Sequence, residues 1–254
     1  MKNTTRRAVM FGVSTLIVTP AFAFEQTRAD VEDDFKRQFK HMDFGMRGPG
    51  NPLPADIEVA NLIVSGDYLP HDDPFEIMKK LSELGTPENL RKFKSTTGQP
   101  FNQRWPNAAN PLLIRFFQDI GYANPPYRGD CTPWCAATIA WCLHRAGYKI
   151  PADPASSQAF KSYGNEVTTP EHGDLCVFGD IGDPAHGHIG FFNGMASTAV
   201  VNVLGGNQGG SLPTKCAAGY PQSKIASVAI PLNLAKDRKV GYHYLIKYVR
   251  PVHA

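Results

Sequence analysis

An apolar segment after Pro133 is the feature that most constrains the fold of this chain. Four small or apolar side chains recur at helical spacing along one stripe: Cys135, Ile139, Cys142 and Ala146. The opposite side of residues 136–146 is almost as apolar, and a helix that is apolar all round is normally buried. The segment therefore predicts a buried helix, ended by Gly147 and exposed only at its N terminus.

Cys135 falls in the first turn of this predicted helix. Pro133 suits the first helical position, and Thr132 can cap the helix just before it. Backbone N–H groups lack helical partners there and the helix dipole is positive, so both effects favour the thiolate, which is the attacking form of cysteine. Taken alone, a cysteine in an apolar helix is more often structural.

Two polar residues further along the chain complete the requirements of a thiol nucleophile. His188 opens a strand-like run, residues 189–192, and imidazole titrates near neutrality, so it can serve as the base. Asn207 follows another strand-like run, residues 199–204, and its amide oxygen could fix the imidazole tautomer. The backbone N–H of Cys135 would be one oxyanion donor. The order cysteine, histidine, amide predicts amide hydrolysis.

Each of these residues also has a structural interpretation. His188 could be a satisfied core or surface histidine, and Asn207 between glycines could be a turn residue that tolerates positive φ. The combination favours catalysis over coincidence because nucleophile, base and orienting group occur together.

Five segments carry a resemblance to a known family. They are Pro133–Ala137, residues 141–143, residues 173–178, residues 187–192 and residues 204–208. Together they resemble CHAP domains, the cysteine- and histidine-dependent amidohydrolases and peptidases related to NlpC-type cell-wall peptidases. The resemblance covers residues 109–250, a little over half of the chain.

The resemblance implies a papain-like CHAP fold and a bacterial peptidoglycan hydrolase, acting as an N-acetylmuramoyl-L-alanine amidase or as a peptide-stem endopeptidase. Cys135 would be the nucleophile, His188 the base and Asn207 the polar third member. The chain departs from the family at one position: many CHAP domains carry a glutamate two residues before the asparagine, and Gly205 stands there.

Other functions stay open at this point. A non-catalytic cell-wall-binding module could keep the same fold, and Gly205 is the best argument for it. An antibacterial toxin effector is a further alternative. Peptidoglycan is the expected partner of a monomeric chain. Three side chains are expected to line the substrate cleft: Trp134, Tyr163 and Gln208. Trp134 could equally belong to the core.

Residues 1–23 read as an export signal. Lys2, Arg6 and Arg7 precede an apolar run, residues 8–18, and residues 21–23 offer a small-x-small cleavage site. The segment fits either a twin-arginine or an ordinary secretory signal, and it predicts a periplasmic or secreted protein. Without it, 23 basic residues balance 23 acidic ones, since the signal holds three of the 26. This balance argues against nucleic-acid binding, and no other run is long enough for stable membrane insertion.

Five cysteines remain after the signal, so an exported chain keeps at least one unpaired thiol. Cys131 and Cys216 are the preferred disulfide pair, while Cys142 and Cys176 are expected to be free core residues. Histidines lie among these cysteines, but their spacing fits no zinc pattern, so neither metal nor another cofactor is expected.

The order of elements predicts an α+β chain. Residues 24–108 form an expected helical N-terminal region, either a cap on the catalytic domain or a recognition arm, with a breaker-rich linker at residues 48–54. Helices are expected at residues 75–84, 87–93 and 111–120. Strands follow at residues 175–178, 189–193, 198–204, 227–232 and 242–249. Residues 109–254 would be the catalytic domain, with its buried helix packed on an antiparallel sheet.

Overall fold

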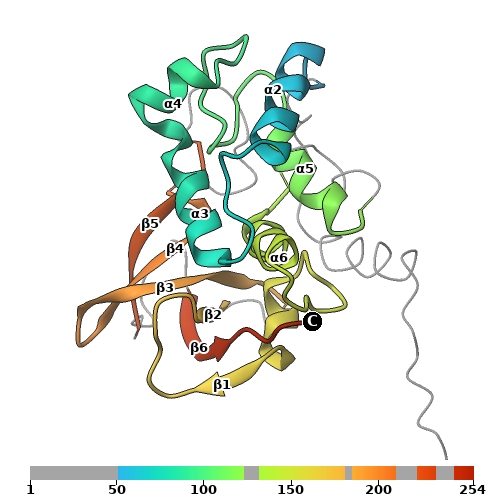
Figure 1. Cartoon of the computed structure of the whole chain (residues 1–254). Helices are drawn as coiled ribbons and strands as arrows, with labels where there is room; N and C mark the ends of the chain where they lie inside the picture. The colour runs from blue at the N-terminus through green and yellow to red at the C-terminus, as the bar shows by residue number, and fades with distance from the viewer. Residues whose placement is uncertain (1–50, 123–131, 181–184, 210–221, 233–242) are drawn as a thin grey trace, which may run out of the picture.

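The computed structural model describes residues 51–122, 132–180, 185–209, 222–232 and 243–254 (Figure 1). The expected signal at residues 1–23 and the expected pair of Cys131 and Cys216 lie outside these residues. Within them, no helix is both long and apolar enough to cross a membrane.

The α-helices of the N-terminal half each begin at a proline, which suits a first helical position because that residue's N–H has no partner inside the helix. They are α2 (Pro54–Ser65), α3 (Pro74–Ser82), α4 (Pro87–Lys92) and α5 (Pro111–Asp119). A short 3-10 turn, η1 (Glu83–Gly85), joins α3 to α4. Asp73, Thr86 and Asn110 cap α3, α4 and α5 with their side-chain oxygens. The three helices expected in this half are confirmed.

Helix α2 was not predicted, because Ile57 and Leu62 face solvent and blur the helical period of its buried residues. Tertiary contacts hold it instead. The buried Asp56 carboxylate accepts hydrogen bonds from the N–H and hydroxyl of Thr96, at 2.7 and 2.6 Å. Arg145 donates from its Nη1 to the carbonyl of Val64 at 2.8 Å.

A six-stranded antiparallel sheet makes up most of the C-terminal half, in the order β1-β6-β2-β3-β4-β5. Its strands are β1 (Asn165–Val167), β2 (Leu175–Asp180), β3 (Gly187–Ser197), β4 (Val200–Gln208), β5 (Lys224–Pro231) and β6 (His243–Arg250). Helices followed by an antiparallel sheet confirm the α+β prediction.

Helix α6 (Cys135–Arg145) lies between the N-terminal helices and one face of the sheet (Figure 1). Alternate residues of the strands face it, among them Leu175 and Val177 of β2, while Cys176 and Phe178 belong to a second apolar cluster on the other face. A 3-10 segment, η3 (Ser157–Ser162), packs beside β2 and β3.

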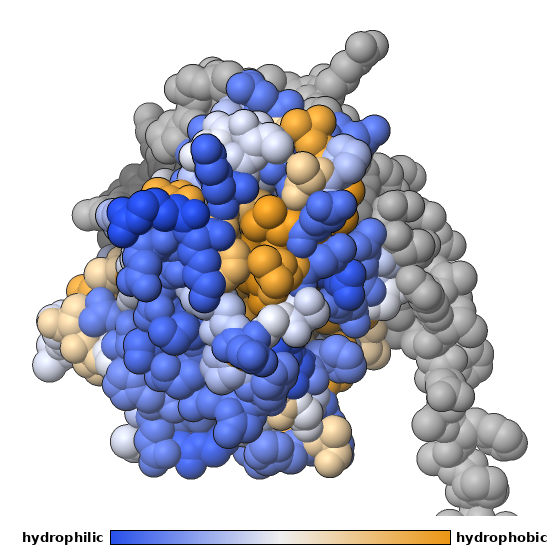
Figure 2. Space-filling view, turned by 45° about the horizontal axis from the view of Figure 1, so that its top comes forward, coloured by the Kyte–Doolittle hydropathy of each residue, from blue (hydrophilic) through white to orange (hydrophobic). Residues whose placement is uncertain are grey.

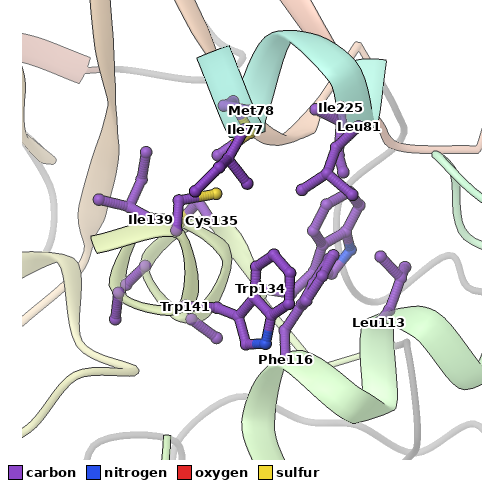
Figure 3. Packing of buried hydrophobic residues seen from close by; sticks show 14 of the residues in the cluster. Ile77, Met78, Leu81, Leu113, Phe116, Trp134, Cys135, Ile139, Trp141 and Ile225 are labelled. Carbon is purple, nitrogen blue, oxygen red and sulfur yellow. The ribbon is translucent and has the colours of Figure 1, made fainter. Parts of the chain in front are cut away.

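The N-terminal helices and the sheet share one core. Side chains of α3 and α5 converge on α6, as Ile77, Leu81 and Phe116 do around Trp134 (Figure 3). On the face of the molecule drawn in Figure 2, apolar residues gather in one patch, and hydrophilic residues surround it. The described residues 51–93 thus pack on the helix that carries Cys135. The division into domains at residue 108 stays a prediction.

Candidate active site

Helix α6 begins at Cys135, two residues later than predicted. Trp134 is its N-cap residue and makes no capping hydrogen bond with its side chain, so the prediction of Thr132 as N-cap and Pro133 as first helical residue is wrong. The first helical bond runs from the N–H of Thr138 to the carbonyl of Trp134, at 3.1 Å. Cys135 is therefore the first residue of the helix, where its N–H has no partner within the helix.

The N terminus of α6 packs closely against the backbone of β4. A Cβ atom added to Gly206 would lie 2.6 Å from the Trp134 ring and 2.8 Å from Oγ1 of Thr138. The absence of a side chain at Gly206 is what allows this approach. Trp134 is completely buried there, so it presents no surface for the predicted substrate contact.

The thiol of Cys135 is buried beside strand β3. Its residue is 6% exposed, and burial raises the pKa of the Cys135 thiol to about 11, while hydrogen bonding from the backbone of Ala136, Ile189 and Cys135 lowers it. The expectation that the helix position favours the thiolate is wrong for this conformation, because loss of water outweighs the N–H groups. The hydrogen bond from Ile189 places the sulfur at the residue that follows His188.

His188 is buried at the start of β3, where it pairs with Phe178 of β2, and the two rings lie 6.3 Å apart. Its Nε2 atom lies 3.3 Å from the side-chain amide of Gln208. Gln158 of η3 supports the neighbouring backbone by donating to the Phe178 carbonyl at 3.0 Å, and it lies where a side chain on Gly187 would be. Sequence reasoning did not identify Gln158.

Gln208 is buried and its amide meets four groups. In the orientation that satisfies all of them, Oε1 accepts from the N–H of Gly205 at 3.1 Å and from Nε2 of His188 at 3.3 Å. Its Nε2 then donates to the carbonyls of Val203 and Ala226, at 3.3 and 3.2 Å. These contacts use both donors of the amide and both acceptor positions of its oxygen, and the expected contact of Gln208 with substrate stays a prediction.

Asn207 has positive φ, at 56°, and its side chain makes no hydrogen bond to any other described residue. This is the backbone conformation that the turn interpretation expected. The structure therefore brings Gln208, and not Asn207, to the imidazole of His188.

Tyr163 lies apart from this group. It is buried, its hydroxyl donates to the carbonyl of Lys149 at 2.9 Å, and burial raises the pKa of Tyr163 to about 12. It lines a cavity of about 450 Å³ with Lys149, Asp153 and Ser162, to which neither Cys135 nor His188 contributes. Its expected role in substrate binding stays a prediction.

The remaining described cysteines are core residues. Cys142 and Cys176 are buried and free, which confirms the expectation for both. In the part of the chain that the structure describes, no three histidine, cysteine, aspartate or glutamate side chains come together as a metal site would need.

Buried thiols and phenols make the folded chain sensitive to alkali. Burial raises the pKa of Cys135 to about 11 and of Tyr163 to about 12, and it raises the pKa of Cys142 and Cys176 as well. The unfolded chain releases these protons at lower pH, so each group stabilises the fold fully below about pH 8.5 and loses that contribution as pH rises through its folded pKa. The midpoint temperature of unfolding should therefore fall steeply between about pH 9 and 11.

Calorimetry or circular dichroism at closely spaced pH values measures this fall. The Cys176→Ala variant, with one buried thiol fewer, should lose stability less steeply over the same interval. A midpoint temperature that stays level from pH 8 to 11 would contradict the buried, protonated state of these groups.

Residues 122–207, about a third of the chain, match the family model of the CHAP domain. This match confirms the resemblance, and it includes Cys135 and His188 and ends at Asn207. No curated protein and no solved structure matches the chain significantly. Helices packed on a six-stranded antiparallel sheet are consistent with a papain-like CHAP fold.

Proposed function

We propose that this chain, which carries a CHAP domain over residues 122–207, cleaves an amide bond of peptidoglycan through Cys135 and His188. A CHAP domain indicates an amidase or peptidase that acts on the cell wall in general. The observation that carries the finer proposal is the position of the thiol. Cys135 is the first residue of a buried helix, and its sulfur receives a hydrogen bond from the residue next to His188.

The raised pKa of Cys135 determines how the reaction would start. With a pKa of about 11, roughly one thiol in 10⁴ is ionised at pH 7, so a pool of free thiolate is not the main nucleophile. His188 would instead take the proton from Sγ while the sulfur attacks the carbonyl carbon. The carbonyl electron pair moves to the oxygen, and the N–H of Cys135 stabilises the resulting oxyanion.

The later steps release the amine and then the acid, and they return Cys135 and His188 to their starting protonation states. The carbon–nitrogen bond breaks as the imidazolium of His188 protonates the departing amine, which leaves a thioester on Cys135. A water molecule then gives its proton to His188 and attacks the thioester. Collapse of this second intermediate releases the carboxylic acid and returns the proton to the thiolate of Cys135.

Two bonds in peptidoglycan fit this chemistry: the N-acetylmuramoyl-L-alanine amide and the amides of the peptide stem. Either substrate lies outside the cytoplasm, in agreement with the export signal proposed at residues 1–23. The protein would act in the periplasm or after secretion.

Mass spectrometry of digested peptidoglycan tests this proposal. Residues 24–254 are incubated with purified peptidoglycan, and each cut adds one water and exposes one new amine, whose position identifies the bond. The control is the same protein with Cys135 alkylated by iodoacetamide, as verified on the labelled peptide. Products no more abundant than in this control would contradict hydrolysis.

A cell-wall-binding module is the second candidate, and one observation favours it. Cys135 is buried and its thiol is protonated at neutral pH, as an unreactive structural cysteine would be. Such a module would sediment with peptidoglycan at pH 7 without releasing any muropeptide. The digestion experiment therefore separates the two candidates when bound protein is measured in the same samples.

A further inference from the structure

We propose that Gln208 is the positioning residue of His188 and takes the orienting role that sequence reasoning gave to Asn207. The proposal rests on the proposed function, since it concerns the base of that reaction. Its primary observation is the contact of 3.3 Å between the Gln208 amide and Nε2 of His188, in a buried setting.

The amide of Gln208 is itself held in place. The backbone N–H of Gly205 donates to its oxygen. Its nitrogen donates to the carbonyl of Val203 in β4 and to the carbonyl of Ala226 in β5. The two carbonyls hold the amide nitrogen and the N–H of Gly205 holds the oxygen, so these three backbone groups fix the plane of the amide. The imidazole of His188 is the second partner of the oxygen. A side chain anchored in this way can orient a neighbour because it has no freedom to follow that neighbour's rotation.

This anchoring selects one imidazole tautomer. The Gln208 oxygen can only accept, so Nε2 of His188 must carry the proton that it receives. In the neutral ring, the lone pair then lies on Nδ1. In this tautomer Nδ1 is the basic atom of the ring, as the proposed proton transfer from the Cys135 thiol requires.

The backbone of β4 explains why position 208 reaches the imidazole. The register between β4 and β5 shifts between Gly205 and Gln208, and Asn207 within this bulge has φ of 56°. A bulge redirects the side chains that follow it. A Cβ added to Gly205 would lie 2.8 Å from the end of the Gln208 side-chain amide, so this amide fills the space that a side chain at position 205 would need.

Alkylation of Cys135 by iodoacetamide at pH 7 tests the proposal without any peptidoglycan. The rate is measured by mass spectrometry of the Cys135 peptide in folded protein. His188→Ala defines the rate without the base. Gln208→Leu, which keeps the volume and removes the amide, should slow alkylation about tenfold or more toward that reference. Gln208→Glu should recover most of the rate, because its near oxygen still accepts from Nε2.

Asn207→Gly is the matched control. It removes the neighbouring amide and keeps a residue that adopts positive φ without strain, so its alkylation rate should stay within about twofold of the native chain. A loss in Asn207→Gly as large as in His188→Ala, with Gln208→Leu unaffected, would assign the role to Asn207 and overturn the proposal.

A spectroscopic measurement needs no variant and stays informative if Gln208→Leu does not fold. The ¹⁵N shifts of the His188 ring should show the tautomer protonated on Nε2, and a ring protonated mainly on Nδ1 would overturn the role of Gln208. A failure of the proposed function looks different: His188→Ala would then alkylate at the native rate, while the tautomer still reports on Gln208.

Discussion

Cys135→Ala is expected to abolish peptidoglycan cleavage, with a loss on the order of 10⁴-fold or more in rate. The variant lacks the atom that forms the thioester, and removing a nucleophile leaves only the assistance of the oxyanion donor and of binding. The fold should persist, because alanine has the highest helix propensity and the change removes a single buried heavy atom. Release of soluble muropeptides, together with the midpoint temperature of unfolding, measures both effects.

Cys142→Ala is the matched control for this substitution. Cys142 lies about two turns further along the same helix, is buried and carries a free thiol. Burial and Arg145 shift its pKa, whereas the pKa of Cys135 also depends on a backbone hydrogen bond from Ile189 of β3. The control should keep the native cleavage rate while losing stability through a small cavity, by about 1 kcal/mol. If Cys135→Ala still releases muropeptides at the rate of Cys142→Ala, Cys135 is not the nucleophile.

Gly206→Ala is expected to have the second largest effect, although residue 206 has no functional group. Its new methyl group would lie 2.6 Å from the Trp134 ring, which is fully buried and cannot rotate away, and 2.8 Å from Thr138 Oγ1. Overpacking of this kind costs about 1–3 kcal/mol, and it would push the first turn of α6 away from β4. A shift of the Cys135 sulfur by about 1 Å would lower the cleavage rate about 10²-fold.

Cleavage rate and unfolding temperature of the variant measure this prediction. Gly85→Ala is the comparison, because the atoms nearest to its added Cβ belong to the side-chain amide of Asn102, at 3.0 Å, among the N-terminal helices. It should lose less stability and keep its cleavage rate. A Gly206→Ala chain with native activity would show that the contact between α6 and β4 does not position the thiol.

The buried helix could be predicted from residues 136–146 because apolar side chains occupy nearly all sides of the predicted helix up to residue 143, and such a helix is normally buried. The α+β class followed from the order of helices and alternating strands in the same way. The helix start could not be predicted to the residue. Pro133 and Thr132 satisfy the local rules for a helix N terminus, but burial of the Trp134 ring against Gly206 sets the first residue at Cys135.

For the thiol, too, the sequence predicts some properties and the folded structure sets others. The spacing of Cys135, His188 and Asn207 is a property of the chain, and the CHAP match includes all three. The pKa of the thiol could not be predicted from the sequence, because desolvation depends on neighbours from α3 and β3 that are distant in sequence.

Sequence alone determined which chemical groups this protein has and the order in which they occur, since nucleophile, base and amide are recognised by residue type. Which amide meets the imidazole depends on the folded backbone. Asn207 and Gln208 are adjacent and chemically alike, and a positive φ within a bulge of β4 turns the second of them toward His188. Side-chain direction past a bulge depends on backbone angles and strand register, which composition and spacing do not encode.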